Sequence, residues 1–159
     1  MITETNRLCS NKQSLGTTAG TTTSTNVLDN GMNTRVYAGT LHFIAKLDNA
    51  DSITGGDSIR VKIQTSNNES FSTSGTGVVT DLLDTGAIAI ATAKAKPYGV
   101  LVDVTLNDMP GILRYVRAQY ITVGSMAAYT VGPVVTAGEF TEAAPTHVKD
   151  FTSAPPATI

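Results

Sequence analysis

Charged side chains, tryptophan and cysteine are scarce in this sequence, and each shortage narrows the class of protein. Charged residues make up 15% of the 159 residues, against about 25% in typical globular proteins. Long solvent-exposed helices draw on Glu and Lys, whereas Thr, Ser, Asn and Gly fill the polar positions here, which favours strands and turns. The one cysteine, Cys9, excludes an intrachain disulfide, leaves the redox compartment open and is interpreted as an inert thiol. The composition therefore predicts an all-β protein.

Clustered cations and long apolar runs are also missing. The formal net charge is −2, and Lys and Arg are scattered along the chain. Nucleic-acid binding needs clustered cations, so no direct nucleic-acid partner is expected. No apolar run approaches the roughly 20 residues of a membrane helix, and the first residues do not form a charged region followed by an apolar one. The sequence predicts a soluble protein without a signal peptide or a membrane segment, made and kept without export.

Groupings of side chains that support catalysis or metal binding are scarce as well. Nucleophilic catalysis needs a base beside Ser or Cys, and the two histidines are His42, in a predicted strand, and His147, in a predicted terminal arm. The acidic residues at 48–51 and the pair Asp81 and Asp84 do not keep the alternating spacing of a calcium loop, and they are interpreted as solvated loop acids. No enzyme activity, catalytic residue, cofactor or metal is predicted.

Alternating apolar residues and turn signals predict about eight strands in a β-sandwich. The clearest strand is 58–65, in which Ile59, Val61 and Ile63 point inward while Arg60 and Lys62 point outward. The other predicted strands are 27–29, 40–47, 78–83, 86–91, 100–106, 113–123 and 126–135. Residues 91–96 have helical propensity, but this run is too short to stand alone as a helix, and a proline ends it.

The stretch 113–123 is expected to be the centre of the fold, in the middle of an antiparallel sheet. It is expected to form a hairpin with 100–106 and to pair in turn with 126–135. Its alternation places one apolar set on one face, namely Val116, Ala118 and Tyr120. The other face is neither cleanly polar nor cleanly apolar, and it carries Tyr115, Arg117, Gln119 and Ile121. A mixed face of this kind indicates contact with something other than bulk water, such as a second subunit or a terminal arm.

Two terminal segments lack the alternation of strands. Residues 1–26 hold a run of small polar residues, and the interpretation stays open between a mobile tail and an arm that orders against a neighbouring subunit. Residues 137–159 hold three prolines and two large anchors, Phe140 and Phe151. The predicted organisation is an N-terminal arm over 1–26, a sandwich domain over 27–136 and a C-terminal arm over 137–159.

Four stretches in order resemble one family of proteins. They are 24–31, 59–66 followed by Phe71 and Ser72, 86–90, and 114–120 with Gly124. In this order and spacing the chain resembles the capsid cement (decoration) proteins of short-tailed bacteriophages, of the Bordetella-phage type, across residues 5–136. Asn30 departs from the family, which tends to carry an apolar residue there, and the tail after Gly138 lies outside the likeness. The resemblance implies a jelly-roll β-sandwich that forms a small homo-oligomer.

The resemblance also implies a place and a role. The protein would be made in the host cytoplasm, bind the outer surface of an icosahedral capsid in the virion, bridge major capsid subunits and stabilise the shell. Its partners would be the major capsid protein and itself, as a homodimer by preference, with a trimer as the alternative. The candidate contact residues are Leu8, Tyr115, Arg117, Gln119, Phe140 and Phe151. The alternative function is a receptor- or glycan-binding β-sandwich module of a phage tail or spike.

Overall fold

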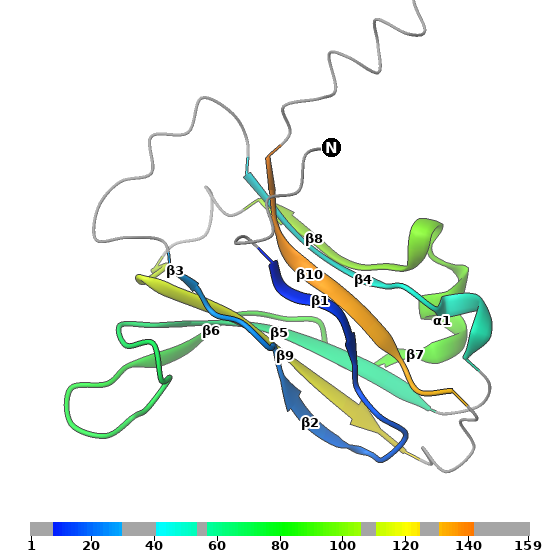
Figure 1. The fold of residues 1–159 in the computed structure, drawn as a ribbon, viewed down its shortest axis with the longest axis horizontal. Coiled ribbons are helices and arrows are strands. Elements are labelled where there is room, and N and C mark those ends of the chain that lie inside the picture. Colours follow the sequence, from blue (N-terminus) through cyan, green and yellow to red (C-terminus); the bar gives the residue numbers. More distant parts are fainter. Residues whose placement is uncertain (1–7, 30–40, 54–56, 106–110, 125–130, 142–159) are drawn as a thin grey trace, which may run out of the picture.

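Two antiparallel sheets packed face to face make up the described part of the chain (Figure 1). The computed structural model describes residues 8–29, 41–53, 57–105, 111–124 and 131–141. Ten strands lie in these ranges, so the predicted all-β sandwich is confirmed, with two more strands than the eight expected.

The smaller sheet has four strands in the order β1-β10-β4-β8. Their bounds are β1 Leu8–Ser14, β10 Val134–Thr141, β4 Leu41–Leu47 and β8 Val100–Thr105. Strand β10 pairs with β1 on one side and with β4 on the other. The last strand of the described chain therefore lies inside the sheet, between the first strand at the edge and β4.

The larger sheet has six strands but is only four strands wide. Their bounds are β2 Gly20–Thr23, β3 Leu28–Asp29, β9 Tyr115–Val123, β5 Ser58–Ser66, β6 Val79–Asp84 and β7 Ile88–Ala89. Strands β2 and β3 follow each other along one side of β9, and β6 and β7 follow each other along one side of β5. Strands β9 and β5 pair along nine residues and form the centre of the sheet, as expected for β9.

The inner faces of the two sheets form one hydrophobic core. The predicted inward residues of β5 and β9 are fully buried, namely Ile59, Val61, Ile63, Val116, Ala118 and Tyr120. Phe43 and Ala45 of β4 and Val135 and Ala137 of β10 close the core from the other sheet. A slip of β5 by one residue would carry its two cations into this core, so the register is strongly fixed.

The N-terminal strands correct the predicted arm over residues 1–26. Strand β1 pairs with β10, and β2 pairs with β9, so residues 8–23 belong to the sandwich. Between β2 and β3 the chain reaches across to β1, where the Asn26 backbone N–H donates to the carbonyl of Cys9 at 2.8 Å. The composition concealed this because the segment has few apolar residues and no alternation. Its threonines still have high β-propensity, and its backbone completes ladders with strands elsewhere in the chain. Residues 1–7 lie outside the described ranges.

At the other end, β10 runs to Thr141, so the predicted boundary between sandwich and C-terminal arm at residue 136 falls within a strand. The rest of the predicted C-terminal arm lies outside the described residues.

Two predicted strand pairings are wrong. Strands β8 and β9 lie in different sheets, so no hairpin joins them. Of the predicted strand 126–135, residues 126–130 lie outside the described ranges, and residues 134 and 135 belong to β10, which pairs with β1 and β4 rather than with β9. The turn signals marked where strands end, but they do not determine which sheet receives the next strand.

One short helix, α1 (Ile90–Ala95), forms in the segment expected to be too short to stand alone. Ile90 and Ala93 are buried in the core, so tertiary packing supplies the stability that six isolated residues lack.

Candidate functional site

The outer face of the larger sheet gathers three of the predicted contact residues. Tyr115, Arg117 and Gln119 alternate along β9, point away from the core and are each half-buried. In the register with β5, Gln119 lies opposite Lys62 and Arg117 lies opposite Gln64. The side chains of β5, β6 and β9 that point away from the core form the outer face.

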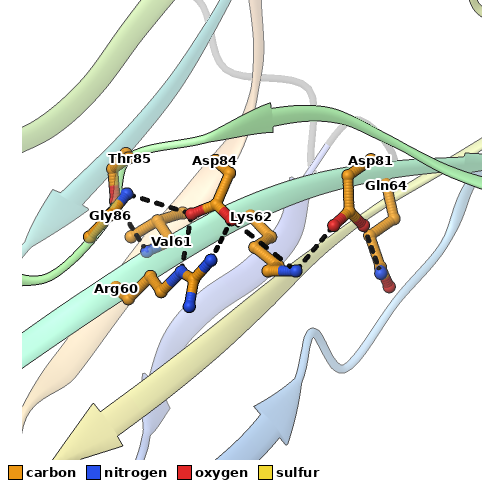
Figure 2. A network of polar contacts seen from close by, with 8 residues as sticks. All are labelled: Arg60, Val61, Lys62, Gln64, Asp81, Asp84, Thr85 and Gly86. Carbon is orange, nitrogen blue, oxygen red and sulfur yellow. Dashed lines mark hydrogen bonds and ion pairs between the residues drawn. The ribbon is translucent and has the colours of Figure 1, made fainter.

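One part of this face, the paired end, consists of two cations and two carboxylates (Figure 2). The Arg60 guanidinium donates through Nε to Oδ1 of Asp84 at 2.6 Å and through Nη2 to the second oxygen of the same carboxylate. Lys62 Nζ donates to Oδ2 of Asp81 at 2.6 Å and lies 3.6 Å from Oδ2 of Asp84. The paired end is therefore a closed network of opposite charges across β5 and β6.

A β-bulge explains why both carboxylates lie on the same face. Ile63 pairs with Leu83 and Gln64 pairs with Asp81, so Leu82 is an extra residue on β6. Asp81 and Asp84 are three positions apart, and a regular strand would direct them to opposite faces. The interpretation of this pair as loop acids is wrong, because both belong to β6 and both are ion-paired, although both are exposed as expected.

The residues after β6 complete the edge of β5. The Val61 backbone N–H donates to the Thr85 hydroxyl oxygen at 3.0 Å, and the Thr85 backbone N–H donates to the Val61 carbonyl at 3.1 Å. The Gly86 backbone N–H donates to Oδ1 of Asp84 at 2.9 Å, as Figure 2 shows. These bonds bridge the gap between β6 and β7 and hold the Asp84 carboxylate in position.

The hydrogen bonds of the paired end favour the charged form of all four groups. The bonds from Arg60 and from the Gly86 backbone hold the pKa of Asp84 well below its ordinary value. The bonds from Lys62 and Gln64 lower the pKa of Asp81. In return, the bonds to Asp84 and Asp81 raise the pKa of Arg60 and of Lys62.

The second part of the outer face, the stacked end, consists of Arg117, Phe71 and Gln64. The Arg117 guanidinium carbon lies 4.2 Å from the centroid of the Phe71 ring, which is cation–π geometry. Arg117 Nε donates to Oε1 of Gln64 at 3.0 Å, and Gln64 Nε2 donates to Oδ1 of Asp81 at 2.7 Å. Partial burial lowers the pKa of Arg117, although a guanidinium remains charged at neutral pH. Gln64 therefore connects the stacked end to the paired end.

Phe71 is held over Arg117 by a loop that is closed by its own hydrogen bonds. It is buried, and its φ of 51° lies in the left-handed region, which a bulky residue rarely adopts. The Asn68 side chain accepts a hydrogen bond from the Ser72 backbone N–H at 3.0 Å and donates to the Ser72 carbonyl at 2.9 Å. A Cβ on Gly77 would lie 1.9 Å from that same carbonyl oxygen, so the loop closes tightly on itself.

The other predicted contact residues lie apart from the outer face. Leu8 is buried in β1 and offers little surface on this chain. Phe140 belongs to β10, where its backbone pairs with His42, and its side chain is not among those that the structure describes. Phe151 lies outside the described residues.

Sequence patterns missed most partners of Arg117. The outward alternation of Gln64 was visible along 58–65, but Phe71 sits in a polar loop whose spacing carries no periodic signal. The approach of Asp81 depends on the bulge at Leu82, which the sequence did not reveal.

No group of three His, Cys, Asp or Glu side chains within the described ranges is placed to hold a metal ion. Over the same ranges, no helix has the length and apolar character needed to cross a membrane. Comparison of the chain with protein-family models and with curated proteins gave no match.

Proposed function

We propose that this protein is a structural virion protein, a capsid decoration protein that binds the outside of an icosahedral phage head. It bridges neighbouring subunits of the major capsid protein and stabilises the shell. The observation that carries the proposal is the outer face, where partly buried side chains of β9 and β5 are braced against one another and against exposed carboxylates of β6. Side chains already held in place lose less conformational entropy when a partner covers them, so such a face is suited to binding a preformed lattice.

The strand order supports the same proposal. If β2 with β3 and β6 with β7 are each counted as one interrupted strand, eight strands result. Their order is then 1-8-3-6 in one sheet and 2-7-4-5 in the other. This arrangement agrees with a double-sheet jelly roll, the fold that the resemblance to capsid decoration proteins implies.

Binding to an assembled lattice gives a non-enzymatic protein a direct means of stabilisation. A protein that binds the assembled shell and not its free subunits shifts the equilibrium toward the shell by mass action. A homo-oligomer of decoration subunits gains further, because each additional contact forms at a high effective concentration. We propose a homodimer, and a trimer is the alternative that a mass measurement of the purified protein distinguishes.

The test uses parent virions with and without this protein. A reconstruction should show its density in many icosahedrally related copies on the shell, and heating should disrupt shells without the protein at a lower temperature than complete shells. Equal heat resistance of the two kinds of shell would contradict the proposal. Density confined to the tail would instead favour the receptor- or glycan-binding module.

A further inference from the structure

The four cations on and beside the outer face are not equivalent. Arg60 and Lys62 are paired with carboxylates at the paired end. Arg114 binds Asp29 through Nε and Nη2, both at 2.9 Å, and the charge of Glu69 also acts on it. Arg117 contacts a ring and an amide, and no carboxylate contacts it in the described part of the chain. It is the cation on this face whose charge is left without a counter-charge in contact.

The edge of the sheet is interrupted beside Arg117. Strand β2 ends with Thr23 opposite Gln119, and β3 begins with Leu28 opposite Val116. Arg117 therefore faces the break between the two strands, where the chain departs toward β1. Tyr115, Gln119 and Ile121 each have a cross-strand partner on that side, whereas Arg117 has none in the described part of the chain.

The Arg117 guanidinium is positioned by its neighbours in the absence of a ligand. The Phe71 ring supports one of its faces, and the Gln64 side-chain oxygen accepts the hydrogen bond from Nε–H. Within the described residues, both Nη nitrogens lack a hydrogen bond, although each carries donors that suit a planar anion. Its partial burial, which also lowers its pKa, strengthens any interaction with an opposite charge.

We infer that Arg117 is a docking point for a carboxylate side chain of a protein partner, held in place by Phe71 and Gln64. A single guanidinium matches one carboxylate through two parallel hydrogen bonds. A phosphate dianion would require further free cations, and the neighbouring cations are already paired. The chemistry of the contact follows from this geometry, whereas a capsid lattice as the partner rests on the proposed function.

A titration of the whole protein tests the chemistry without a capsid. The probe is a blocked tripeptide with a central Glu, and the matched control has Gln at that position. The Nε–Hε resonance of Arg117 should shift saturably with the Glu peptide and not with the Gln peptide, while the Arg114 resonance should stay nearly constant. An absent shift, or an equal shift at Arg114, overturns the inference.

Shell binding then tests the partner. Arg117→Gln should weaken binding to shells by about tenfold or more, as expected when one member of a partly buried charge pair is removed. Arg114→Gln, the matched variant of a cation that already has a carboxylate, should change it much less. Thermal unfolding of both variants checks that they are folded. Equal losses in shell binding overturn the inference. If the unaltered protein does not bind shells, the proposed function fails, and the peptide titration still decides the role of Arg117.

Discussion

The inner face of β9 is filled by the chain itself, whereas its outer face is only half covered. Val116, Ala118 and Tyr120 have no exposed surface, because β5 and the opposite sheet enclose them. Arg117 and Gln119 alternate with them along one strand, yet they remain half-buried among side chains of the same sheet. The inner face has no further surface to bury, so it determines stability, and the outer face keeps surface that a partner can cover.

The outer face is itself divided. At the paired end, cations and carboxylates satisfy one another, and this part of the face needs no partner. At the stacked end, Arg117 is positioned by Phe71 and Gln64 without meeting an opposite charge. The paired end therefore contributes to folding, and the stacked end is the part of the face better suited to recognition.

The largest effect should come from removing an inner side chain of β9. Tyr120→Ala should lower the free energy of unfolding by about 4 kcal/mol, because it leaves a cavity in the core. It also removes the hydroxyl, which donates to the Ser10 hydroxyl oxygen at 2.8 Å and links the two sheets. Ile121→Ala, at the next position on the outer face, should cost only about 1 kcal/mol, since that side chain is half-exposed. Urea unfolding of both variants measures the difference, and equal costs would contradict the contrast between the two faces.

A smaller effect is expected where the loop supports Phe71. In Gly77→Ala the new Cβ would clash with the Ser72 carbonyl, so the loop has to open, at a cost of about 2–3 kcal/mol. Gly75→Ala is the control in the same loop. Its Cβ would meet no atom within 4 Å, and only its φ of 67° makes the change unfavourable, by about 1 kcal/mol.

The same pair of variants tests whether the stacked end is rigid. In Gly77→Ala the Nε–Hε resonance of Arg117 should move, since Phe71 no longer lies over the guanidinium. In Gly75→Ala it should stay in place. If both variants unfold alike and leave Arg117 unchanged, the loop adapts to the added methyl group, and Phe71 does not depend on it.

Local patterns predicted the inner faces well. Alternation in 58–65 and 113–123 identified buried residues such as Ile59, Val61 and Tyr120, because the period of a strand depends only on the strand itself. Partners across strands were harder to predict. The expected hairpin of 100–106 with 113–123 failed because the chain changes sheets between these strands. The polar N-terminal segment was expected to be an arm because it lacks apolar alternation. Its stability comes from ladders with β9 and β10, and composition does not reveal such pairings.

The candidate site could be predicted only in part, because alternation identifies outward residues and not their contacts. Tyr115, Arg117 and Gln119 were identified as one outward set from alternation alone. That Arg117 would lie over Phe71, while Arg60 and Lys62 would find carboxylates, depends on a loop conformation and on the bulge at Leu82. Neither feature has a period, so the sequence showed which residues face outward but not which of them are already paired.

Removing the carboxylates of the paired end should have the smallest effect on stability at neutral pH. In acid, the same change should separate the paired end from the stacked end most clearly. The folded-state pKa values of Asp81 and Asp84 lie below the unfolded value of about 3.9. Their contribution to stability is therefore complete above that value and is lost as the pH falls through the lower folded values. The double variant Asp81→Asn with Asp84→Asn should consequently lose less stability than the unaltered protein between about pH 5 and pH 2.

Arg117→Gln provides the matching control, because Arg117 contacts no carboxylate among the described residues and its removal should leave the acid dependence unchanged. The raised pKa values of Arg60 and Lys62 cannot mimic the effect, since their contribution is present at low pH and is lost only as the pH rises toward those values. Urea unfolding at several pH values compares the three proteins. Parallel curves for the double variant and the unaltered protein would mean that the paired end does not stabilise the fold. Its charges would then be as available to a partner as that of Arg117.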